Sequence, residues 1–124
     1  MSDTEKTREQ WYDECIQMQQ NGNLAGAVTE LAKLAEVYPD YPLVHLALAV
    51  FYNKQNRDTE SLAQMSLACD LAKEDPFYYT AFSALAIKSG QRTQAEEALM
   101  KAQEARFAAQ LAKMREENQA KNEE

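Results

Sequence analysis

Residues 21–35, NGNLAGAVTELAKLA, recur in outline at residues 55–69, QNRDTESLAQMSLAC, and at residues 89–103, SGQRTQAEEALMKAQ. The offset from Gly22 to Asn56 equals that from Asn56 to Gly90, since 56 − 22 = 34 and 90 − 56 = 34. We call this offset the repeat length. Glycine and asparagine readily adopt the left-handed backbone conformation that ends a helix. The pattern therefore predicts three equivalent helix–turn–helix hairpins.

Small and apolar side chains recur on both sides of each turn. After the turn they have the spacing i, i+4, i+7, which is one face of a helix, and this face is predicted to meet the first helix of the hairpin. These positions are Ala27, Ser61, Ala95; Leu31, Met65, Leu99; and Leu34, Ala68, Ala102. Before the turn, the inner positions are Trp11, His45, Tyr79; Glu14, Leu48, Phe82; Cys15, Ala49, Ser83; and Met18, Tyr52, Ala86. Glu14 is the one misfit, which a first repeat tolerates because no repeat precedes it.

Start and stop signals divide the chain into helices near 8–21, 24–37, 42–55, 58–73, 76–89 and 93–118. Thr7 with Gln10, and Thr93 with Glu96, have the spacing of capping boxes, and Asp58 is a candidate N-cap. The segment YPDYP at 38–42 and Pro76 separate the hairpins, because proline does not continue a helix.

Trp11, Gly22, Ala27 and Pro39 lie at the spacings of the tetratricopeptide signature, so residues 8–107 resemble that repeat family. The second repeat departs from the signature, with Asn56 for the turn glycine, Ser61 for the small alanine and a proline three residues late. Its second helix is therefore expected to run longer. The resemblance implies an all-α, right-handed α-solenoid of three antiparallel helix pairs with an extended C-terminal helix. We expect a flexible N-terminus at 1–7, repeats at 8–41, 42–75 and 76–107, and a helical extension with a polar, disordered tail at 108–124.

The resemblance also implies that the first helices line a concave surface that binds a protein or peptide partner. Some members of the family hold a terminal carboxylate with a clamp of polar and basic residues, but Tyr12, Ile16, Ala47, Phe77 and Ala81 stand at those places. We therefore expect an apolar groove that takes an amphipathic helix or extended segment, with an acid against two lysines. Alternatively, the lysines are simply solvated and several apolar residues belong to the core. The groove residues are Tyr12, Ile16, Leu43, Leu46, Val50, Asn53, Lys54, Phe77, Thr80, Ala84, Ile87 and Lys88.

The last helix carries a second apolar stripe. Met100, Phe107, Leu111 and Met114 fall within about 60° of one another at 100° per residue, away from the face predicted to pack on the third repeat. The stripe could hold a second copy of the chain, bend back over the array or meet another protein, and a homodimer is our preferred interpretation. A structural subunit that assembles through this helix is thus the alternative to a peptide-binding adaptor, and a frayed, solvated tail is the alternative to both.

Charge and composition exclude several functions. The net charge of −7 disfavours nucleic-acid binding, and no apolar run approaches the roughly 20 residues that span a bilayer, so a soluble cytoplasmic protein is expected. Cys15 and Cys69 have no paired-cysteine spacing and are expected to be buried thiols. His45 is the only histidine and is expected to be a packing residue. We therefore predict no catalytic residues, no metal site and no cofactor, and so no enzyme.

Overall fold

The computed structural model describes residues 5–123 and contains six helices in sequential pairs. These are α1 (Arg8–Gln20), α2 (Leu24–Val37), α3 (Pro42–Lys54), α4 (Asp58–Leu71), α5 (Pro76–Lys88) and α6 (Arg92–Asn122). Helices form at all six predicted places, and the last is the longest, so the predicted all-α class is confirmed. The chain divides after Leu71 into two compact units, α1–α4 and α5–α6.

The repeat register governs where the helices begin. The three first helices start at Arg8, Pro42 and Pro76, each one repeat length after the last, and each is 13 residues long. The predicted left-handed turns are confirmed, with φ of 89° at Gly22, 62° at Asn56 and 75° at Gly90. Asn56 can replace glycine because asparagine tolerates this conformation better than other residues that carry a Cβ.

The first unit is held together by a continuous core. Helix α2 packs on both α1 and α3, and α3 packs on α4. Leu31 and Leu34 of α2 are fully buried, as are Cys15 of α1 and Val44 of α3. Helix α2 is the central helix of this core, because it packs on a helix at each side. Burying each of its two leucines contributes roughly 1.5 to 3 kcal/mol.

Of the three N-terminal caps that the sequence predicts, one is confirmed and two are wrong. Thr7 and Gln10 form the predicted capping box, with Thr7 Oγ1 accepting from the Gln10 amide at 3.1 Å. The box predicted for Thr93 and Glu96 is wrong, because α6 begins earlier, with Gln91 at its N-cap and no side-chain cap hydrogen bond. Asp58 is the first residue of α4 and not its N-cap. The carbonyl of Arg57 accepts the first hydrogen bond of that helix from Ser61 at 2.9 Å.

The expectation of a longer second helix in the second repeat is also wrong. Helix α4 ends at Leu71 and has 14 residues, the same length as α2. The residues between Leu71 and the next helix form a turn that ends at Asp75, whose side chain caps α5. Pro76 is not late in the register, since it lies one repeat length after Pro42 and both are the first residue of their helix. The real departure is that Lys73 stands where the first repeat has Pro39.

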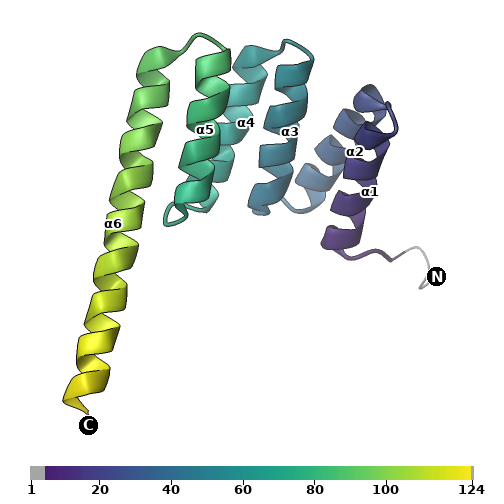
Figure 1. Cartoon of the computed structure of the whole chain (residues 1–124). Helices are drawn as coiled ribbons and strands as arrows, with labels where there is room; N and C mark the ends of the chain where they lie inside the picture. The colour runs from purple at the N-terminus through teal and green to yellow at the C-terminus, as the bar shows by residue number, and fades with distance from the viewer. Residues whose placement is uncertain (1–4, 124) are drawn as a thin grey trace. The chain divides into compact units, whose positions relative to one another are not determined.

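In the second unit, α5 and α6 form an antiparallel pair whose second member is much longer (Figure 1). At 1.5 Å per residue the 31 residues of α6 extend about 46 Å, against about 20 Å for the 13 residues of α5. Ala95, Ala98 and Ala102 of α6 are buried, whereas every described residue after Ala105 is exposed. Helix α6 runs four residues past its predicted end, so the stretch expected to be a disordered tail is helical up to Asn122; Glu124 lies outside the described residues.

Candidate functional site

Helix α5 presents one open face that carries all five groove residues predicted for it. Phe77 is 54 % exposed and Ile87 is 63 % exposed, so two large apolar side chains lie open on one helix. Thr80, Ala84 and Lys88 are also exposed, and the five positions fall within about 100° on the helix. We call these five residues the outer face of α5.

A cation lies beside this face. Arg106 of α6 donates from Nη2 to Thr80 Oγ1 at 3.1 Å, and the Thr80 hydroxyl donates to the carbonyl of Pro76 at 3.0 Å. Lys88 lies on the face itself, so two cations accompany its two exposed apolar side chains. This combination favours an apolar ligand that carries an acidic group.

The groove residues of the first unit are less open. Tyr12, Ile16, Leu43 and Val50 are half-buried and pack against the core, so they act partly as structural residues. Leu46 and Asn53 are half-buried as well, whereas Lys54 is exposed. The predicted continuous groove across all three first helices stays a prediction.

The outer stripe of α6, Met100, Phe107, Leu111 and Met114, is exposed as predicted. The exposed fractions are 60 %, 61 %, 36 % and 57 %. None of the four is buried against a described residue of this chain, so the stripe is available to another molecule. It lies on the side of α6 opposite the buried alanines that face α5.

Leu99 corrects one prediction about the inner face of α6. Its register equivalent Leu31 is fully buried beneath α1 and α3, but Leu99 is 42 % exposed. The reason is topological, because α2 has a helix packed on each side whereas α6 packs on α5 alone among the elements of its unit. Ile87, Ala95 and Leu99 line a cavity of about 340 Å³ at this edge, with the ion pair of Arg92 and Glu96 at its rim.

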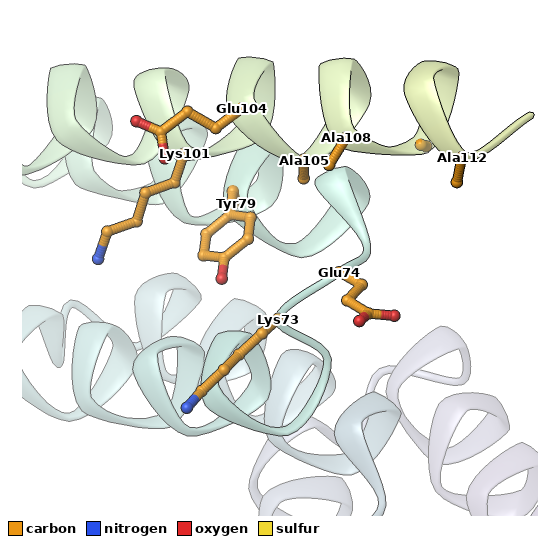
Figure 2. A pocket seen from close by; sticks show the side chains of 9 residues that line it. Lys73, Glu74, Tyr79, Lys101, Glu104, Ala105, Ala108 and Ala112 are labelled. Carbon is orange, nitrogen blue, oxygen red and sulfur yellow. The ribbon is translucent and has the colours of Figure 1, made fainter. Parts of the chain in front are cut away.

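Figure 2 shows a larger cleft in the second unit, beside the part of α6 that outruns α5. It has a volume of about 590 Å³ and combines an alanine floor with charged residues and the ring of Tyr79. Sequence reasoning missed it, although α6 lacks a turn where the first repeat turns after Val37, and this difference could have signalled it. The lining residues are Lys73, Glu74, Tyr79, Lys101, Glu104, Ala105, Ala108, Ala109 and Ala112.

Polar links join the helices of the first two pairs at one register position. Trp11 hydrogen-bonds Glu30, and one repeat length further on in both helices His45 Nδ1 lies 2.8 Å from Gln64 Oε1. His45 Nε2 lies 2.7 Å from the carbonyl oxygen of Pro39. His45 is thus buried with both ring nitrogens hydrogen-bonded, which confirms its packing role. In the third pair the equivalent of Gln64 is Ala98, so this link has no counterpart there.

The two cysteines are buried free thiols, as predicted. Burial raises the pKa of the Cys15 thiol to about 11, and the nearby carboxylates of Glu30 and Glu14 act in the same direction. A thiol with such a pKa stays protonated at neutral pH and is a poor nucleophile or metal ligand. Among residues 5–123, no three acidic, histidine or cysteine side chains are grouped so as to hold a metal ion. No helix in that range is long and apolar enough to span a membrane.

Comparison with known proteins identifies the fold. The sequence matches no protein-family model and no curated protein. Among solved structures, the Yersinia enterocolitica type III secretion translocator chaperone SycD matches with a TM-score of 0.71 and 17 % identity, over 95 % of this chain and 96 % of that one. A second match is the second TPR of Spaghetti (RPAP3) bound to an HSP90 peptide, with a TM-score of 0.68 and 12 % identity, over 78 % of this chain and 90 % of that one.

A chain of the CopN–Scc3 complex matches with a TM-score of 0.71 and 17 % identity, over 79 % of this chain. This chain covers only 58 % of the length of that one. All three neighbours are tetratricopeptide-repeat proteins, and identities this low show the fold alone. The six helices fit three tetratricopeptide repeats, and the chain has the tetratricopeptide-repeat fold.

Proposed function

We propose that this chain is a protein-binding module and that the outer face of α5 contacts the partner. The observation that carries the proposal is the exposure of Phe77 and Ile87 on one face of a first helix. Buried aromatic and aliphatic anchors contribute most of the energy of protein interfaces, so two such side chains left open are candidates for anchors. Three fold neighbours support the proposal, since their names describe a chaperone, a peptide complex and a protein complex.

The partner is an amphipathic helix or an extended apolar segment that carries an acidic residue. Its apolar side chains cover Phe77 and Ile87, and its acid lies near Lys88 and Arg106. Because Phe77 and Ala81 occupy two places of the carboxylate clamp, we do not expect recognition of a terminal carboxylate. Tyr12, Ile16, Leu43, Leu46, Val50, Asn53 and Lys54 form the second proposed set, which lies on α1 and α3.

A photo-crosslinking amino acid placed singly at Phe77 or Ile87 tests the α5 site in the native cell. The expected result is one shared partner from both positions and none from a matched control at Lys33, an exposed residue of α2. Lys88→Glu should weaken the capture because it removes the attraction to the partner's acid. Equal capture from Lys33, or no capture from either α5 position, would contradict the proposal.

A second candidate function is that of a structural subunit that assembles through α6. The exposed outer stripe of α6 favours it, because monomeric proteins rarely leave four large apolar side chains unpaired on one helix face. The two functions use different helices and can be separated by mutation. Phe107→Glu with Leu111→Glu should change the oligomeric state and leave capture at Phe77 intact.

A further inference from the structure

Three of the four residues of the outer stripe of α6 are spaced symmetrically about Phe107, whereas Leu111 has Gln103 at its mirror position. Met100 and Met114 both lie seven residues from Phe107, since 107 − 100 and 114 − 107 are each seven. A seven-residue apolar repeat keeps one seam of a helix facing a second helix in a left-handed pair. A seam that is symmetric about its centre can pair with a copy of itself that runs in the opposite direction.

The stripe is placed so that a second helix can reach it. Its centre lies about 160° around α6 from the buried residues Ala95, Ala98 and Ala102, which face α5. All residues of α6 from Arg106 to Asn122 are exposed. A second helix laid along the stripe therefore meets apolar side chains without displacing α5.

One pair of opposite charges beside the seam, Glu97 and Arg115, is matched in the antiparallel arrangement and not in the parallel one. With the two-fold axis at Phe107, Glu97 of one copy and Arg115 of the other lie on the same side of the seam, about 3 Å apart along the axis. Gln103 and Gln110 meet in the same way on the other side. In a parallel pair, Glu97 and Arg115 of the two copies would be eighteen residues apart, which is about 27 Å.

We infer that α6 pairs with α6 of a second copy of this chain, antiparallel, with the two-fold axis at Phe107. This inference rests on the second proposed function, assembly through α6. The pairing sets Met100 against Met114 of the second copy and Phe107 against its own symmetry mate, with Leu111 beside them. The contact involves one helix from each copy, so it belongs to the small, reversible class of interfaces.

Cysteine cross-linking of the full chain tests the geometry. Phe107→Cys should form a disulfide-linked dimer on mild oxidation, because a residue on the two-fold axis lies next to its own mate. Met100→Cys and Met114→Cys should link to each other when mixed and link poorly to themselves. Ala112→Cys, an exposed residue of α6 about 130° away from the stripe, is the control and should stay unlinked. The native thiols Cys15 and Cys69 are buried and do not compete.

Self-linking of Met100→Cys without linking to Met114→Cys would show a parallel pair and overturn the inference. Linking of Ala112→Cys at the same rate as Phe107→Cys would overturn it as well, by showing random collision. Glu97→Arg should weaken the dimer, and the added change Arg115→Glu should restore it. If the double variant dimerises no more tightly than Glu97→Arg alone, the proposed alignment of the two helices is wrong.

Sedimentation of the native chain separates this inference from the function on which it rests. A dimer is expected at high micromolar concentration, and Phe107→Glu should weaken it by roughly tenfold or more, because the substitution buries a charge in the seam. Circular dichroism checks that this variant remains folded. A native chain that stays monomeric overturns both the assembly function and the pairing. A dimer with the wrong cross-linking pattern overturns the pairing alone.

Discussion

Helices α2 and α6 occupy the same place in the first and third repeats, yet one is the centre of a core and the other is mostly solvent-exposed. Leu31 and Leu99 are register equivalents, with exposed fractions of 0 % and 42 %. Helix α2 ends at Val37 and the chain turns back into α3, which covers it, whereas α6 continues for 31 residues without a turn. The same repeat position is thus structural where a second helix packs on it and exposed where no described helix does.

The largest expected effect comes from leucine truncation at these two positions. Leu31→Ala should lower the free energy of unfolding by about 2 to 5 kcal/mol, because it leaves a cavity in a closed core. Leu99→Ala should cost about 0.5 kcal/mol or less, because water already reaches that side chain. Urea denaturation followed by circular dichroism measures both, and equal losses would contradict the burial difference.

Ionisation of the buried Cys15 thiol is a second test of the closed core of the first unit. Its folded pKa of about 11 lies above the ordinary value of 9.0, so the unfolded chain loses the thiol proton first as the pH rises. The contribution to stability is therefore intact below pH 9 and is lost between pH 9 and pH 11. Cys15→Ala should flatten the fall in unfolding free energy over this window. An unchanged slope would contradict the buried, protonated thiol.

The N-termini of α1 and α6 differ in whether a side chain caps the helix. Thr7→Ala should destabilise by about 1 kcal/mol, because it removes the hydroxyl that caps α1. Thr93→Ala should have an effect within about 0.5 kcal/mol, because Thr93 lies inside α6 and caps nothing. Thermal unfolding of the two variants measures the difference. A similar loss of stability from both variants would show that Thr93 caps α6, as the sequence predicted.

The smallest effect is expected from shortening α6. A chain that ends at Ala108 loses no buried residue, since all described residues after Ala105 are exposed. Its urea midpoint should therefore match that of the full chain within error, whereas its self-association should be lost. A clear drop in the midpoint would show that the end of α6 contributes to the fold.

The internal repeat was enough to predict the six helices, because each local signal, whether turn residue, proline or apolar period, acts within one hairpin. Details that depend on neighbouring elements were predicted less well. The register predicts a covered Leu99, because the repeat spacing cannot show that α6 continues without a turn and that no described helix packs on its second side. Thr93 and Asp58 have the sequence signature of caps but do not cap their helices, because cap geometry depends on one or two residues at the boundary.

Candidate site residues were predicted in the same uneven way. The exposed positions of α5 and α6 follow from helical periodicity alone, and Phe77, Ile87 and Phe107 are exposed as expected. The half-buried state of Tyr12 and Ile16 depends on packing from other elements, including the edge contact between the rings of Tyr12 and Tyr41 at 6.1 Å. The cleft in Figure 2 needs the length of α6 relative to α5, which no single motif encodes.

Hydrogen exchange along α6, measured as a function of protein concentration, tests most directly whether its outer stripe binds a second molecule. In dilute solution we expect slow exchange for the amides of α2 and fast exchange for α6 beyond Arg106, since nothing described in this chain covers that segment. Raising the concentration should slow exchange in α6 around Phe107 and leave α2 unchanged. Protection of that segment equal to α2 at the lowest concentration, or no change at the highest, would contradict a face reserved for a second molecule.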